Sequence, residues 1–114
     1  MQITNSIYKT VGFSHKSPKQ LTIVQWAEVE ENINKLYNNF TLRLKEQFPS
    51  FTNNDLQVCC LIKLRITVSD IAKILNISPA SVSKRKQRIK EQIIKELGDN
   101  FDKSQLIDIW IWEY

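Results

Sequence analysis

Signals for the start of a helix recur along this sequence, and they constrain its fold more than any other feature. Three pairs have the spacing of a capping box, in which each residue satisfies a backbone donor of the other: Thr22 with Gln25, Thr52 with Asp55, and Thr67 with Asp70. Ser78-Pro79 adds a fourth start, because proline is tolerated at the first helical position. Only two Gly and three Pro occur in 114 residues, which disfavours a turn-rich β fold. We therefore expect an all-α fold with a long N-terminal support helix and a short C-terminal helix.

The first half of the chain divides into an arm and a long apolar pattern. Residues 1–20 have no sustained periodicity, so we expect an N-terminal arm or linker there. Residues 21–50 predict one amphipathic helix of about 25 residues, because apolar side chains recur at steps of three and four until Pro49. The stripe consists of Trp26, Val29, Ile33, Leu36 and Phe40.

This stripe has two interpretations, since it either packs on the chain's own helices or pairs with a second copy. A core of residues 51–95 has too little surface to cover both this stripe and a second one around Trp110 and Trp112. Exposed apolar patches of that size usually mark an interface. We therefore expect a homodimer through Trp26, Val29, Ile33, Leu36 and Phe40.

Residues 51–97 contain the pattern of a helix-turn-helix, and residues 98–114 that of a C-terminal packing helix capped by Asp102. A short helix is predicted over Val68 to Leu75, and Asn76-Ile77-Ser78 predicts a tight turn. A second helix over about 79–96 then occupies the place of a recognition helix, which lies in the DNA major groove. The predicted inner positions are Ile71, Ala72 and Leu75 in the first helix and Val82, Ile89 and Ile93 in the second.

Positive charge is concentrated in that second helix. Residues 81–95 hold six basic side chains and one acidic one, a surplus of five, whereas the whole chain has a net charge of +4. Such a patch is either a solvated helix face or the footprint of a nucleic-acid binder. For binding to double-stranded DNA we expect Lys84, Gln87 and Arg88 at base edges, Ser81 and Ser83 near phosphates, and Lys86 and Lys90 on the backbone.

Other classes of function find little support. The only cysteines, Cys59 and Cys60, are neighbours without metal-ligand spacing, so we expect buried free thiols. With one His and no definable carboxylate pair, neither a catalytic set nor a cofactor or metal site can be assembled, and we expect no enzyme. No apolar run reaches 18 residues, so we expect no membrane contact within this chain. We expect a cytoplasmic location, either as a free chain or as the cytoplasmic part of a larger, membrane-anchored regulator. The alternative to DNA binding is a helical module for protein–protein interaction or dimerisation.

The residues of this helix-turn-helix resemble the LuxR-type (GerE) DNA-binding domain of transcription regulators, a winged-helix-like superfamily. The resemblance covers about 45 residues, and it departs at Arg65, Ser83 and Arg85, where the family usually has Gly, Lys and His. The flanks resemble the C-terminal cytoplasmic domain of Bacteroidetes regulators that begin with tetratricopeptide repeats, which implies a fragment or a stand-alone relative. Matching positions are Phe51, Thr52, Asp55, Thr67, Asp70, Ile71, Ala72, Leu75, Ile77, Ser78, Ser81, Val82 and Ile89.

Overall fold

The computed structural model describes residues 20–114, so the expected arm over residues 1–20 lies almost entirely outside the described part. Within that part the chain is all-α and contains no strand, as the helix-start signals predict. The elements are α2 (Ile23–Leu36), α3 (Phe40–Gln47), α4 (Asn53–Lys63), α5 (Val68–Leu75), α6 (Pro79–Leu97), the 3₁₀ helix η1 (Gly98–Asn100) and α7 (Ile107–Glu113).

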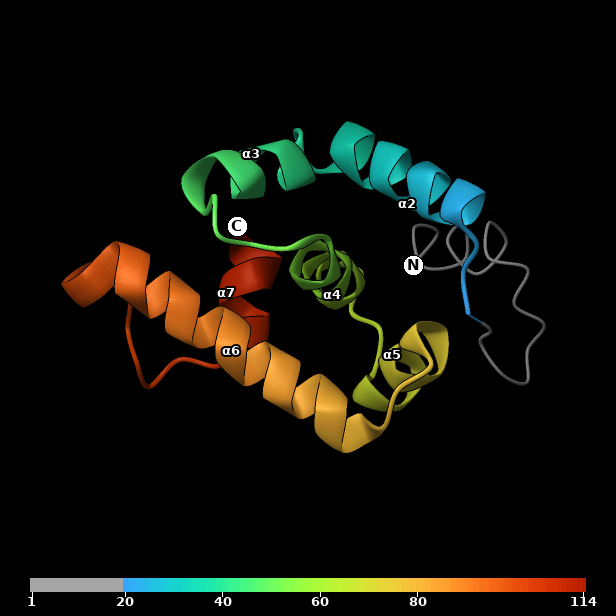
Figure 1. Ribbon diagram of the computed structural model, residues 1–114. Coiled ribbons are helices and arrows are strands. Elements are labelled where there is room, and N and C mark those ends of the chain that lie inside the picture. Colours follow the sequence, from blue (N-terminus) through green and yellow to red (C-terminus); the bar gives the residue numbers. More distant parts are fainter. Residues whose placement is uncertain (1–19) are drawn as a thin grey trace.

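Helix α4 forms the centre of the molecule. It starts at the capping box that the sequence predicts: Thr52 Oγ1 accepts from the Asp55 backbone N–H at 3.1 Å, and the Asp55 carboxylate accepts from the Thr52 N–H at 2.9 Å. From Val58 to Lys63 every side chain is buried, and a helix that is apolar on all sides belongs in a core. Helices α3, α6 and α7 pack around it, and Figure 1 shows α2 and α3 on one side of α4 and α6 on the other.

The prediction of a single long helix over residues 21–50 is wrong, because this segment forms two helices, α2 and α3, separated by a break in the backbone. Asn38 and Asn39 have φ angles of 52° and 57°, a left-handed conformation that asparagine tolerates better than most residues. The Asn34 side chain accepts from the Thr41 N–H and donates to Thr41 Oγ1, both at 2.9 Å, and so bridges the break. Arg43 donates to the carbonyls of Tyr37 and Asn38 that the break leaves without helical partners.

The apolar stripe of α2 and α3, through which the homodimer was predicted, packs largely within the chain's own core. Val29, Ile33 and Phe40 are fully buried within one protomer. Trp26 is half-buried against the same core, and Leu36 is exposed. The break between the helices turns α3 so that both can cover α4, and a straight 25-residue helix would lack this freedom. The stripe therefore offers no continuous surface to a second copy.

Helix α7 packs against the same core, so the second apolar stripe, around Trp110 and Trp112, is also largely covered. Trp112 Nε1 donates to the Ile62 carbonyl at 2.8 Å, and Trp110 packs edge-on against Phe48. Lys63 Nζ donates to the carbonyls of Ile111 and Trp112, where a cation offsets the negative end of the helix dipole. Helix α7 begins at Ile107 rather than near Asp102, whose carboxylate instead accepts from the Ser104 N–H in a turn.

Candidate nucleic-acid interface

Helices α5 and α6 and the turn between them follow the sequence closely. Thr67 Oγ1 caps α5 by accepting from the Asp70 N–H at 3.2 Å, and Ser78 Oγ caps α6 by accepting from the Ser81 N–H at 3.1 Å. Asn76 ends α5 with a left-handed φ of 56°. The chain therefore leaves α5 and enters α6 within three residues, and both predicted helices are confirmed at these positions.

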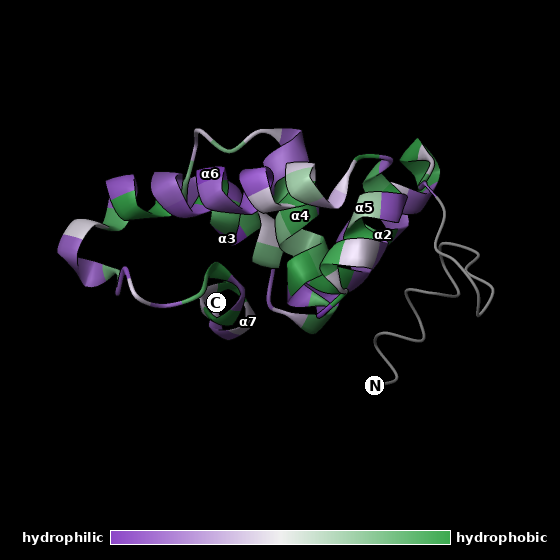
Figure 2. Ribbon diagram, turned by 90° about the horizontal axis from the view of Figure 1, so that it is seen from below, coloured by the Kyte–Doolittle hydropathy of each residue, from purple (hydrophilic) through white to green (hydrophobic). Residues whose placement is uncertain are grey.

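Buried apolar side chains hold α6 against α4 and α5. Val82, Ile89 and Ile93 are fully buried and lie on one side of α6, as predicted. On α5 the buried side chains are Ile71, Ala72 and Ile74, whereas Leu75, expected among them, is only half-buried. Figure 2 shows the contrast between a largely hydrophobic α4 and a largely hydrophilic α6. The opposite side of α6 is thereby held toward solvent.

Four of the seven predicted contact residues gather on this exposed side. Ser83, Lys84, Gln87 and Arg88 are all exposed, and the last three follow at i, i+3 and i+4. We call these four residues the outer face of α6. Within residues 20–114, the side chains of Lys84 and Gln87 form neither a hydrogen bond nor an ion pair. Two long polar side chains are thus available to a ligand.

The other three predicted residues lie elsewhere. Lys86 points toward α7, where its ammonium lies 2.9 Å from the Asp108 carboxylate and its side chain is only 15% exposed. Ser81 is half-buried at the start of α6, and its hydroxyl is hydrogen-bonded to Ser78 Oγ. Lys90 is half-buried at the margin of the outer face. The prediction that Lys86 contacts a DNA backbone is not supported by this placement.

One contact of the outer face was not foreseen from the sequence. Arg88 Nη2 lies 3.4 Å from Asp55 Oδ2, and the Arg88 side chain is 56% exposed whereas that of Asp55 is 2% exposed. Local spacing identifies Asp55 as a cap residue, but it gives no sign of a partner 33 positions later. Arg88 also lines a shallow groove of about 480 Å³ with Pro49, Ser50, Gln92, Lys95 and Glu96. This groove continues the outer face toward the loop between α3 and α4.

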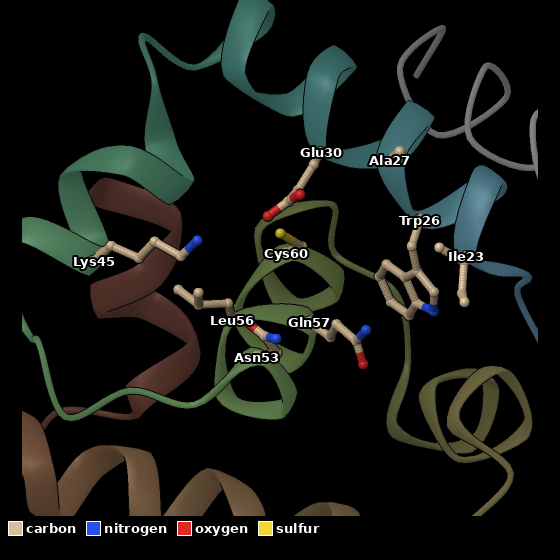
Figure 3. A pocket seen from close by; sticks show the side chains of 9 residues that line it. All are labelled: Ile23, Trp26, Ala27, Glu30, Lys45, Asn53, Leu56, Gln57 and Cys60. Atoms are coloured by element: carbon tan, nitrogen blue, oxygen red, sulfur yellow. The ribbon is translucent and has the colours of Figure 1, made fainter.

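A second groove, of about 290 Å³, lies between α2, α3 and α4 (Figure 3). Trp26 extends into it from α2, and the polar ends of Glu30 and Lys45 face it from α2 and α3. Beside it the α2 side chains Ile23 and Val24 are 89% and 68% exposed. The groove is lined by Ile23, Trp26, Ala27, Glu30, Lys45, Asn53, Leu56, Gln57 and Cys60.

The two cysteines are buried free thiols, as predicted. Burial raises the pKa of Cys60, and the nearby Glu30 carboxylate raises it further. Burial likewise raises the pKa of Cys59, with smaller contributions from Cys60 and Asp55. Nucleophilic attack and metal binding require the thiolate, so both groups are held in their unreactive form.

Comparison of the chain with protein-family models, curated proteins and solved structures found no match. Among the described helices, none combines the length and the apolar content needed to cross a membrane. The part of the chain that the structure describes also contains no group of three or more His, Cys, Asp or Glu side chains placed to hold a metal ion.

Proposed function

We propose that this chain is a sequence-specific DNA-binding module of a transcription regulator, with α5 and α6 as a LuxR-type helix-turn-helix. The observation that carries the proposal is the outer face of α6, which presents Ser83, Lys84, Gln87 and Arg88 to solvent while the opposite side of the same helix is buried. A basic helix fixed in this manner has the shape and the charge that the major groove accepts.

The dimensions of α6 fit this role. Its 19 residues span about 28 Å, and the major groove of B-DNA, about 12 Å wide, admits one α-helix. Helix α5 packs against α6, and in a helix-turn-helix such a contact with the first helix would support the second. The fixed start of α6 would let its first turns enter the groove while its later turns lie over the backbone.

The side chains of the outer face divide into two roles. Lys84 and Arg88 suit the O6 and N7 acceptors of guanine, and Gln87 suits the N6 and N7 groups of adenine. Ser83 and Lys90 lie beside them and suit phosphate oxygens, and Ser81 lies at the start of α6, where the helix dipole favours an anion. We leave Lys86 out of the interface because Asp108 occupies its ammonium.

The sequence resemblance to LuxR-type domains supports the same assignment, and it implies action in the cytoplasm. A homodimer through the stripe of α2 and α3 is not part of the proposal, because Val29, Ile33 and Phe40 are buried inside one protomer. The proposal therefore requires only that one copy binds duplex DNA through α6.

A second candidate is a protein-interaction module, and the groove between α2 and α4 favours it. Ile23 and Val24 are the most exposed large apolar side chains of the described chain. Ile23 lines that groove together with Trp26, and Val24 is its neighbour in the sequence. Exposed apolar groups next to a concave surface are typical of a docking site for another protein. This function would use α2 and would leave the outer face of α6 without a ligand.

Charge reversal on two surfaces separates these candidates. Binding of a fluorescently labelled duplex with a random sequence is measured by anisotropy at low salt. The variant Lys84→Glu/Arg88→Glu removes two cations from α6, whereas Lys35→Glu/Lys45→Glu makes the same change in charge on α2 and α3. We expect the α6 variant to lose at least about tenfold in affinity and the control variant to lose far less. Equal losses, or a wild-type chain that binds no duplex, would overturn the proposal.

A further inference from the structure

The ion pair between Asp55 and Arg88 joins two parts of the molecule with different burial. Asp55 belongs to the first turn of α4, and its carboxylate is almost completely buried. Arg88 belongs to the middle of α6, and more than half of its side chain is exposed. A fixed internal carboxylate thus contacts a guanidinium at the surface where the proposed function places the DNA.

The Asp55 carboxylate is held in place by its own helix. Its Oδ2 accepts from the Thr52 N–H at 2.9 Å, and this hydrogen bond completes the capping box of α4. The same oxygen faces Arg88 Nη2 at 3.4 Å. Because the carboxylate is already fixed, it restrains the guanidinium without itself losing side-chain freedom.

The restraint leaves most of the guanidinium available. A guanidinium has five N–H donors in a planar fork, and the contact with Asp55 uses one of the nitrogens, Nη2. Reading guanine takes two donors, directed at O6 and N7. Nη1 and Nε are not engaged by any group within residues 20–114. Nη2 carries two N–H groups, so the one that does not face Asp55 forms a parallel fork with Nη1 or with Nε, and this fork can reach O6 and N7.

We propose that Asp55 is a positioning residue that holds Arg88 for the recognition of one guanine in the DNA site. This inference rests on the proposed function. It predicts that Asp55 increases sequence discrimination without contacting DNA. A long side chain that is already restrained loses less conformational freedom on binding, and the effect on discrimination at that base pair is about 2- to 12-fold.

A positioning role for Asp55 predicts that its substitution changes affinity for random DNA and preference for the guanine in opposite directions, which a purely structural role does not predict. Asp55→Asn keeps an oxygen that can accept from the Thr52 N–H, but it removes one negative charge beside the basic surface. Binding to random duplex is therefore expected to strengthen slightly, because phosphates are no longer repelled. Preference for the guanine is expected to fall at the same time, which a loss of folding would not produce.

The experiment begins with selection of preferred sites by the wild-type chain from a randomised duplex library. Binding to the selected duplex and to single base-pair variants is then measured for wild type, Arg88→Ala, Asp55→Asn and Asp55→Glu. Asp70→Asn, which makes the same change in charge in the first turn of α5, is the control. We expect Arg88→Ala and Asp55→Asn to relax preference at the same base pair, Asp55→Glu to retain it, and Asp70→Asn to leave it unchanged.

The possible failures are distinguishable. If the wild type selects a site and Asp55→Asn discriminates as well as wild type, the positioning role is overturned and DNA binding stands. If Arg88→Ala reduces the preference at no base pair of the selected duplex, Arg88 does not recognise a base and the inference is overturned. If the wild type selects no sequence, the proposed function and this inference are both overturned. If Asp55→Asn unfolds, as judged by circular dichroism, the inference is tested by comparing the guanine preference of Asp55→Glu with that of Arg88→Lys. Lysine lacks the planar fork of donors, so Arg88→Lys is expected to lose the preference even though Asp55 is present, whereas Asp55→Glu is expected to retain it.

Discussion

The ammonium of Lys86 on α6 lies 2.9 Å from the Asp108 carboxylate on α7, and the two side chains are 15% and 31% exposed. A partly buried ion pair of this kind links the proposed recognition helix to the C-terminal helix. Its role is therefore in the stability of the fold rather than in contact with DNA.

Lys86→Ala is accordingly expected to lower the free energy of unfolding by about 1–2 kcal/mol, since Asp108 is left without its partner. Urea denaturation measures this loss, and a double-mutant cycle with Asp108→Ala isolates the energy of the pair. Once folded, the Lys86→Ala variant should bind duplex nearly as tightly as wild type. If Lys86→Ala is as stable as wild type but loses as much DNA affinity as Lys84→Ala, Lys86 contacts DNA and the structural role is contradicted.

Substitutions on and beside the outer face of α6 should distinguish residues that contact base edges from residues that bind the DNA backbone. Lys84→Ala or Gln87→Ala is expected to cost about 1–3 kcal/mol on the preferred site and to relax preference at one base pair, because a base-edge contact is lost. Lys90→Ala should weaken all duplexes alike and reduce the salt slope by about one. Competition binding with cognate and random duplexes measures both effects. Equal losses on both duplexes for all three variants would contradict the assigned roles.

Ile33 tests whether the stripe of α2 and α3 is internal. Ile33→Ala should lower the free energy of unfolding by about 2–5 kcal/mol, because it leaves a cavity in a fully packed core. Leu36→Ala, one turn away and exposed, is the control and should change stability by less than about 1 kcal/mol. An Ile33→Glu variant that remains folded and converts a dimer to a monomer in sedimentation would contradict the internal packing and support the pairing predicted from the sequence.

Helix starts were predictable because their signals are local. Thr52, Thr67 and Ser78 each lie three residues before the backbone N–H that they accept, so the sequence alone locates α4, α5 and α6. The break at Asn38 and Asn39 was not predictable in the same way. Steps of three and four continue across it without interruption, and two asparagines inside a helical pattern give only a weak signal for a left-handed backbone.

The candidate site was predictable to the extent that periodicity determines it. The positions of Lys84, Gln87 and Arg88 on the exposed side follow from the spacing of Val82, Ile89 and Ile93, which must face the core. The partners of Lys86 and Arg88 come instead from α7 and α4, 22 and 33 positions away in the sequence. Contacts of that range depend on how helices pack, and spacing within one helix carries no information about them.

The buried thiols predict a loss of stability at alkaline pH. Burial raises the pKa of Cys59 and of Cys60 above the ordinary value of 9.0, so above about pH 9 the unfolded chain loses protons that the folded chain keeps. The free energy of unfolding should fall there by about 1.4 kcal/mol per pH unit for each thiol.

A variant with Cys59→Ala and Cys60→Ala is the comparison for this slope. The pKa of Lys63 is lowered by burial and that of Tyr114 is raised by burial, so both groups also contribute near pH 10, equally in wild type and variant. Urea denaturation from pH 8 to 10.5 should show a steeper fall for wild type than for the variant. Parallel slopes, or rapid alkylation of the native thiols at pH 8, would show that they are not protected as the structure implies.

The central claim is tested most directly by the salt dependence of duplex binding. Affinity for a labelled duplex is measured at several salt concentrations, and the slope of log K against log salt counts the phosphates that the protein neutralises. The three basic residues of α6 that the proposal places on DNA, Lys84, Arg88 and Lys90, predict a slope of about −2.7, and all five basic residues of α6 other than Lys86 would give about −4.5. No binding at the lowest salt concentration, or an affinity that stays constant across the series, would contradict DNA binding through α6.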